Sequence, residues 1–207
     1  MAADRQTVLS WLADLAATTV TDVDDLSDIS QRIVAAPALD AAAFAAETLA
    51  ITRIIAESVT LPAEFDRIAA PASASGETLQ AFSILVAMGS AIAGCRVEWP
   101  SRPAARRART RVSAAGDAGA TAAGSLGGDG ADLYAWLTAV TAIACRLISD
   151  IAADAAPIIR VETGVSLPST VLAYQLYGDA TRAGAMVDLA GSATPMIMPT
   201  LFDALAS

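Results

Sequence analysis

The stretch "SLPSTVLAYQLYGDATRA", Ser166 to Ala183, has the most specific local chemistry of this 207-residue chain. Pro168 suits the first turn of a helix, and Gly178 can supply the left-handed exit that ends it. Asp179 follows directly and can cap a second short helix that runs to about Leu189. The stretch therefore predicts two short helices joined by a tight Tyr-Gly-Asp turn.

The residues on either side extend these helices into a small α+β unit. "IIRVET", Ile158 to Thr163, is rich in β-branched residues and predicts a short strand, after which Gly164 turns the chain. The tail from Pro195 to Leu205 contains "MIMPTLF" and is suited to a return strand. We therefore expect a strand-helix-helix-strand unit over residues 158–207.

Apolar residues at helical spacing dominate the preceding residues 1–157 and predict a helical bundle. The predicted helices begin near Asp4, Thr21 (whose spacing to Asp24 fits a capping box), Asp40, Glu77, Pro103 and Ala131. Prolines predict a loop over 61–76, and glycines predict a flexible connector over about 116–130. The fold class is thus mainly α, a helical bundle with a small α+β C-terminal unit.

The composition argues against an enzyme. The chain has no histidine, which excludes histidine-based catalysis and histidine-ligated zinc. Acid pairs such as Asp24 and Asp25 fit helix starts, and residues 127–130 (Gly-Gly-Asp-Gly) lack the Lys-Ser/Thr of a phosphate-binding loop. We expect no catalytic residues, no cofactor and no metal.

The balance of apolar and charged residues points to an assembly. Hydrophobic residues make up 55% of the chain, the mean hydropathy is +0.51, and much of the apolar content is alanine, which allows close helix contacts. We expect a homo-oligomer or a multi-copy component.

The apolar run Ala81–Cys95 predicts a buried helix, with a membrane helix as the alternative. The acidic, polar N-terminus predicts no signal peptide.

Two further features leave alternatives open. Cys95 and Cys145 fit buried reduced thiols or an interhelical disulfide. The net charge is −9, yet six arginines crowd one stretch: Arg96, Arg102, Arg106, Arg107, Arg109 and Arg111. On a helix Arg102, Arg106 and Arg109 share a face. Three interpretations of this cluster are open: the arginines form a solvated helix face, pair with acidic surfaces of neighbouring subunits, or contact phosphate.

The segment "VETGVSLPSTVLAYQLYGDATRAGAMVDLAG" followed by "MIMPTLF" resembles the LysM module, and most closely the C-terminal part of the DNA circularisation proteins of Mu-like phages, which are tail or baseplate components. The resemblance covers about residues 160–202. It implies a structural virion protein of the baseplate or tail tip, assembled in the bacterial cytoplasm, that contacts other tail proteins. The candidate interface residues are Leu167, Tyr174, Leu176, Tyr177, Asp179 and Arg182, with Arg102, Arg106 and Arg109 on the body.

The resemblance also implies two alternative functions. LysM modules that hold glycan usually carry an Asp after the first Gly and an Asn after the second helix, where this chain has Val165 and roughly Ala190-Gly191. Tyr174, Tyr177 and Asp179 suit either stacking on a sugar or packing and a protein interface. A peptidoglycan-binding module is therefore one alternative. The other is a DNA-contacting channel or DNA-end protein, which the arginine cluster would serve, although an acidic chain makes nucleic acid an unfavourable partner.

Overall fold

The computed structural model describes residues 3–206, and it divides the chain into two compact units. The helical unit comprises the residues up to Trp99 together with 106–151, and the C-terminal unit comprises 100–105 and the residues from Ala152. The expected division near residue 157 thus lies close to this boundary. The start of one long helix and the end of another are counted with the second unit.

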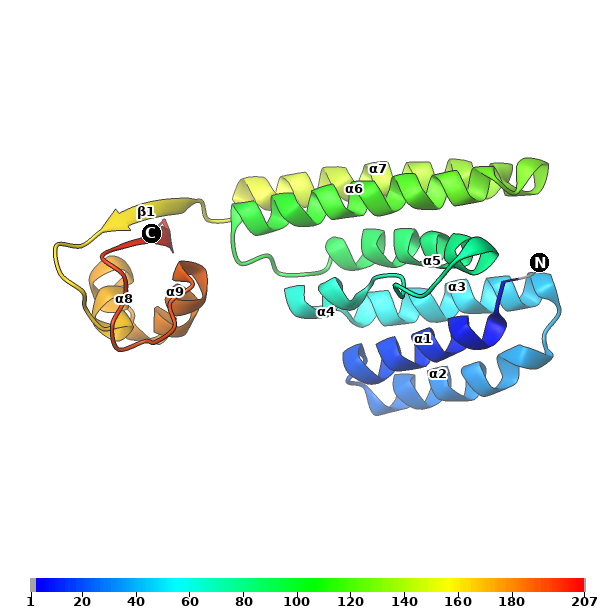
Figure 1. Cartoon of the computed structure of the whole chain (residues 1–207), viewed down its shortest axis with the longest axis horizontal. Coiled ribbons are helices and arrows are strands. Elements are labelled where there is room, and N and C mark those ends of the chain that lie inside the picture. Colours follow the sequence, from blue (N-terminus) through cyan, green and yellow to red (C-terminus); the bar gives the residue numbers. More distant parts are fainter. Residues whose placement is uncertain (1–2, 207) are drawn as a thin grey trace. The chain divides into compact units, whose positions relative to one another are not determined.

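The helical unit is built from antiparallel helices. They are α1 (Arg5–Thr19), α2 (Val23–Ala35), α3 (Ala41–Ser58), α4 (Pro62–Arg67), α5 (Gly76–Gly94), α6 (Arg102–Gly124) and α7 (Ala131–Asp154), with short 3-10 helices at Ala36–Ala38 and Gly127–Gly130 (Figure 1). Asp4, Asp22 and Asp40 cap α1, α2 and α3, each accepting hydrogen bonds from backbone N–H groups of the first turn. The predicted cap at Thr21 is therefore wrong by one residue, because the carboxylate of Asp22 takes that role.

The main core lies where α1 packs on α3 and α5. Trp11 meets Phe82 edge to face with ring centroids 5.2 Å apart, and its indole Nε1 donates to Ala69 O at 3.0 Å. Leu12, Ile51 and Ile55 are buried beside them. Residues 61–76, expected as a loop, begin with the short helix α4, whose Phe65 is buried and stacks edge to face on Trp99.

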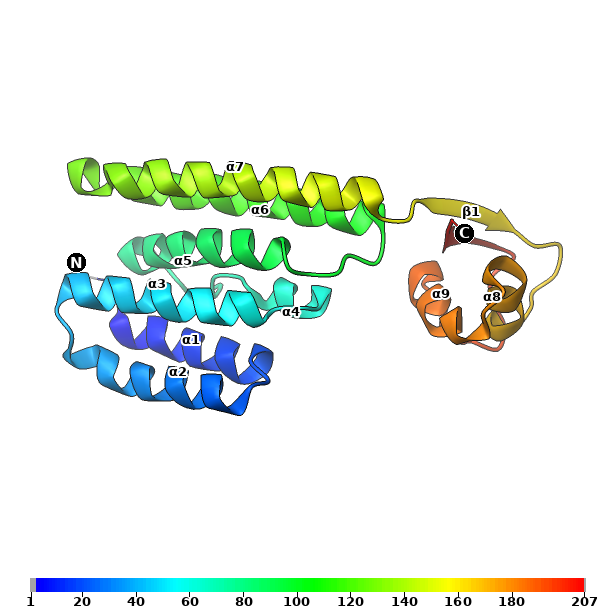
Figure 2. The ribbon, with the colours of Figure 1, turned by 180° about the vertical axis from the view of Figure 1, so that it is seen from behind.

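Helix α5 lies between α3 on one side and α6 and α7 on the other (Figures 1 and 2). Its small residues make both contacts close. A Cβ on Gly89 would meet the side chain of Thr52 at 3.2 Å, and one on Gly94 would meet Ile148 at 2.9 Å and Val112 at 3.1 Å. The apolar run 81–95 is therefore packed within the helical unit, as the buried-helix interpretation predicts.

The flexible connector predicted over about 116–130 is wrong. Helix α6 continues to Gly124, and Gly127–Gly130 forms a 3-10 helix that leads directly into α7. The glycines are contact residues, since a Cβ on Gly116 would lie 2.3 Å from the side chain of Thr141 and one on Gly119 would lie 2.5 Å from Ala87. Glycine is used here to bring two helices together, and the surrounding contacts offset its low helix propensity.

The C-terminal unit has the predicted strand-helix-helix-strand order. Strand β1 (Ile158–Glu162) pairs antiparallel with β2 (Leu201–Leu205), Val161 lying opposite Phe202. Between them lie α8 (Ser169–Tyr177), a 3-10 turn at Ala180–Arg182 and α9 (Ala183–Ala190). Gly178 and Gly191 end the two helices in the left-handed conformation, with φ of 70° and 60°. The buried side chains of Leu172, Met186, Met198 and Phe202 form a separate core.

Candidate functional site

Two loops of the C-terminal unit are held side by side by hydrogen bonds. One loop, residues 163–168, joins β1 to α8, and the other, residues 195–200, leads into β2. Thr163 N donates to Thr200 O at 2.8 Å, Met198 N donates to Leu167 O at 3.1 Å, and Ser169 N at the start of α8 donates to Pro195 O at 2.8 Å. The hydroxyl of Ser166 also donates to Met198 O. The three backbone bonds alternate in direction along the pair, and all four bonds hold the two loops together.

These paired loops present apolar side chains to solvent. Met196 is 68% exposed, Ile197 65% and Val165 61%, whereas the adjacent Met198 is fully buried and anchors the second loop in the core. Three large apolar residues on a backbone held in this way indicate a contact surface, because such a surface loses little conformational freedom when a partner covers it. We call Val165, Met196 and Ile197 the paired-loop surface.

Sequence reasoning did not identify these residues as a site, because "MIMPTLF" was interpreted as one return strand. Pro199 lacks the N–H that a strand ladder needs, and β2 accordingly begins two residues later, at Leu201. Met196 and Ile197 are therefore left outside the sheet. Pro199 is the signal that separates the exposed part of this segment from the strand.

Most of the candidate interface residues predicted on α8 and the following turn support the unit itself. The hydroxyl of Tyr177 accepts a hydrogen bond from Leu205 N at 3.0 Å, and the guanidinium of Arg182 lies over its ring, 4.3 Å from the centroid. Leu167 and Leu176 are partly buried against the core. Tyr174, at 66% exposed, is the one aromatic among them that is open to solvent.

Asp179 acts as a cap. Its carboxylate accepts hydrogen bonds from Thr181 Oγ1 at 2.7 Å and from Thr181 N at 2.9 Å. The side-chain bond, followed by the backbone bond, holds the pKa of this carboxyl below its ordinary value. The arrangement accounts for Asp179 as a turn residue that orders the path from α8 to α9.

The arginines of the cluster have separate roles. Arg102 donates from Nε to Ala152 O and from Nη2 to Ala153 O, both at 3.0 Å, and so binds the last carbonyls of α7. Arg111 pairs with Asp66, donates to the carbonyls of Asp66 and Ile68, and lies over Phe65. Within residues 3–206, the side chains of Arg106 and Arg107 are exposed and make no hydrogen bond or ion pair.

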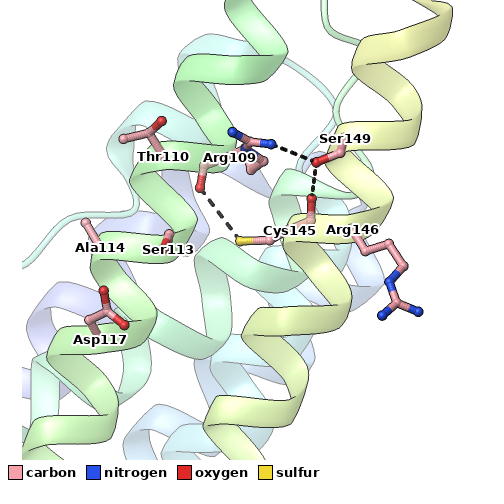
Figure 3. A pocket seen from close by; sticks show the side chains of 8 residues that line it. All are labelled: Arg109, Thr110, Ser113, Ala114, Asp117, Cys145, Arg146 and Ser149. Carbon is pink, nitrogen blue, oxygen red and sulfur yellow. Dashed lines mark hydrogen bonds between the residues drawn. The ribbon is translucent and has the colours of Figure 1, made fainter.

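Arg109 belongs to a polar groove between α6 and α7, with a volume of about 610 Å³ (Figure 3). It donates to Ser149 Oγ at 3.2 Å, and Ser149 Oγ donates to Cys145 O at 2.7 Å. Asp117 also lines the groove and places a negative charge in it. Arg146 lines the groove as well, so the groove carries two positive charges and one negative charge.

Both cysteines are free thiols. Cys145 Sγ lies 3.8 Å from Arg109 O, and Cys95 Sγ lies 3.8 Å from Ala144 O. Partial burial raises the pKa of each thiol above its ordinary value. The structure agrees with the interpretation as reduced thiols and shows no disulfide among the described residues.

Two further features concern metal binding and membrane insertion. Among residues 3–206, no group of three or more Cys, Asp or Glu side chains is placed to hold a metal ion. Two helical stretches, 76–94 and 127–154, are long and apolar enough to cross a membrane. The first is the core helix α5, and the same length and composition occur in the core helices of soluble proteins, so this test is weak.

The chain was compared with known proteins at two levels, whole families and individual curated sequences. Neither comparison, with protein-family models or with curated proteins, finds a match.

Proposed function

We propose that this protein is a structural, non-enzymatic component of a phage or phage-like tail, at the baseplate or tail tip. In this proposal the helical unit contributes to a multi-copy assembly, and the C-terminal unit, which we propose to be LysM-like, docks on another tail protein. The protein would then be located in the virion after assembly in the bacterial cytoplasm. The proposal begins from the resemblance of residues 160–202 to the C-terminal part of the Mu-like tail proteins.

The paired-loop surface is the observation that supports docking. In the resemblance, Val165 occupies the position where glycan-binding LysM modules usually carry an Asp, and it is 61% exposed. Exposed Met196 and Ile197 lie on the adjoining loop. Sugars are recognised by polar groups and aromatic faces, whereas exposed aliphatic side chains on a fixed backbone favour a protein partner.

The arginines give less support to a DNA role. Arg102, Arg109 and Arg111 bond to other residues of the chain, which leaves Arg96, Arg106 and Arg107 as the exposed side chains of the cluster without a partner among the described residues. A chain with a net charge of −9 needs a larger basic surface to overcome repulsion of a polyphosphate. A tail protein that contacts other proteins therefore remains the best-supported function.

The proposal is tested with the double variant Val165→Asp/Ile197→Asp. Both side chains are exposed, so we expect the fold to persist while docking is lost, because two carboxylates would have to be desolvated in the interface. The measurement is the amount of this protein in purified particles, by quantitative mass spectrometry. The matched control is Val34→Asp, which adds a carboxylate at an 82% exposed position on α2.

Loss of the double variant from particles, with retention of the Val34→Asp control, supports docking through the paired-loop surface. Normal incorporation of the double variant contradicts it. Absence of the unmodified protein from particles overturns the tail assignment as a whole. Pelleting of the purified protein with cell-wall sacculi would then favour the peptidoglycan-binding alternative.

A further inference from the structure

Helix α7 carries two apolar stripes, and the helical unit covers only one of them. Leu137, Ala144 and Ile148 are buried against α5 and α6. On another face Trp136 is 43% exposed, Ile143 60% and Leu147 47%, with Val140 partly buried between them. In the most apolar 18-residue window of 127–154 the buried share is 22%, against 44% for the corresponding window of α5. The most apolar part of α7 is thus less buried than that of α5.

The exposed stripe has the spacing of a helix-pairing seam. Trp136, Val140, Ile143 and Leu147 follow one another at alternating steps of four and three residues, as the a and d positions of a heptad do. Asp150 takes the next position of the pattern and ends the seam with a charge. We call these four residues the α7 seam.

Charged residues flank the α7 seam in a self-complementary way. Asp132 and Arg146 lie two heptads apart, so both fall on the same side of the seam, one at each end. Both side chains are exposed, and neither makes a hydrogen bond or ion pair with any other residue of the described range 3–206. Arg146 borders the groove between α6 and α7, and Figure 3 shows its guanidinium on the side of α7 away from Arg109.

We infer that the α7 seam binds the α7 seam of a second copy of this chain, with the two helices antiparallel. A two-fold axis near Val140 places Asp132 against the partner's Arg146 at one end and repeats the pair at the other. A parallel arrangement would bring like charges to the same level, which is unfavourable. This inference concerns the helical unit and does not depend on the tail assignment.

The test measures the mass of the purified full chain by sedimentation velocity over a range of concentrations. The unmodified chain is expected to sediment as a dimer, and Ile143→Glu/Leu147→Glu is expected to sediment as a monomer with an unchanged far-UV circular dichroism spectrum. The control Val34→Glu places the same charge at an exposed position on α2 and is expected to stay dimeric. A monomeric unmodified chain overturns the inference.

A charge exchange tests the antiparallel direction. Asp132→Arg alone brings two arginines together at each end of the seam and is expected to weaken dimerisation by at least tenfold; Arg146→Asp alone brings two carboxylates together, with the same effect. The double exchange Asp132→Arg/Arg146→Asp is expected to restore dimerisation, whereas no recovery contradicts the pairing.

A membrane is the other possible partner of the seam. Flotation of the unmodified chain with vesicles of zwitterionic lipid, lost in Ile143→Glu/Leu147→Glu, would assign the seam to a membrane and overturn the inference.

Discussion

Two pairs of glycines, one pair from each unit, serve opposite purposes. In the C-terminal unit Gly178 and Gly191 have φ of 70° and 60°, and a Cβ on either would touch nothing within 4 Å. In the helical unit Gly116 and Gly119 are inside α6, where a Cβ would collide with a neighbouring helix. A glycine-rich segment can therefore form either a turn or a close helix–helix contact. Which of the two it forms depends on whether another helix packs against it.

The largest predicted effect comes from truncating a core side chain of the C-terminal unit. Phe202 is 4% exposed at the centre of the C-terminal unit, so Phe202→Ala is expected to destabilise that unit by about 3–5 kcal/mol. All three tryptophans lie in the helical unit, and their fluorescence is expected to report an unchanged denaturant transition. Methyl resonances of Met186 and Met198 report the loss of the C-terminal core.

Leu201→Ala is the matched control for Phe202→Ala, since Leu201 is the neighbouring strand residue and is 45% exposed. We expect it to cost less than about 1 kcal/mol, as substitutions near the surface usually do. A shift of the tryptophan transition in Phe202→Ala would show that the two units do not unfold separately.

A smaller effect tests the contact role of glycine in α6. Gly119→Ala would bring a methyl group to 2.5 Å from Ala87 Cβ and 3.0 Å from Ser83 O, so we expect a net loss of about 1–3 kcal/mol despite the better helix propensity of alanine. Gly128→Ala, which meets nothing within 4 Å, is expected to be neutral or slightly stabilising. Thermal unfolding followed by circular dichroism measures both, and equal stability of the two variants would restore the interpretation as a flexible connector.

The smallest predicted effect compares the acid caps of the two units. Hydrogen bonds from Thr7 to Asp4, and from Thr181 to Asp179, lower the pKa of both carboxyls from the ordinary value of 3.8. A carboxyl with a lowered folded-state pKa contributes stability above its unfolded pKa and loses it as the pH falls through the folded value. We therefore expect α1 and the turn after α8 to loosen only below about pH 4.

Carbon-detected NMR titration of the two carboxyl groups checks this prediction, together with the amide shifts of Thr7 and Thr181. Thr181→Val should return the pKa of Asp179 toward 3.8 and leave that of Asp4 unchanged. A midpoint of Asp179 at or above 3.8 in the unmodified chain would contradict the capping geometry.

The secondary structure of the C-terminal unit was predictable because its signals are local. Gly178 fixes a helix end and Asp179 the next helix start, and both depend only on neighbours in sequence. The α6–α7 contact was not predictable in the same way, since Gly119 is explained by Ala87 on a distant helix. A single sequence gives no sign of which helix will lie opposite.

The candidate functional residues show the same difference between local signals and contacts of residues that are distant in sequence. Tyr177 was recognised as a specific residue, yet its hydroxyl serves Leu205 N across the unit, a contact between residues that are distant in sequence. Val165 was singled out as a departure from the glycan-binding pattern, but its proximity to the loop carrying Ile197 depends on hydrogen bonds such as Met198 N to Leu167 O. The exposure of Val165, Met196 and Ile197, by which the paired-loop surface is defined, depends on tertiary packing and not on neighbours in the sequence.

The two half-buried thiols have a practical consequence for spectroscopy. Since burial raises the pKa of Cys95 and Cys145, little reactive thiolate is present at either position near neutral pH. A cysteine introduced at an exposed position such as Val165 would react much faster with a maleimide dye or spin label. A label is therefore expected to react at the introduced cysteine before it reacts at Cys95 or Cys145.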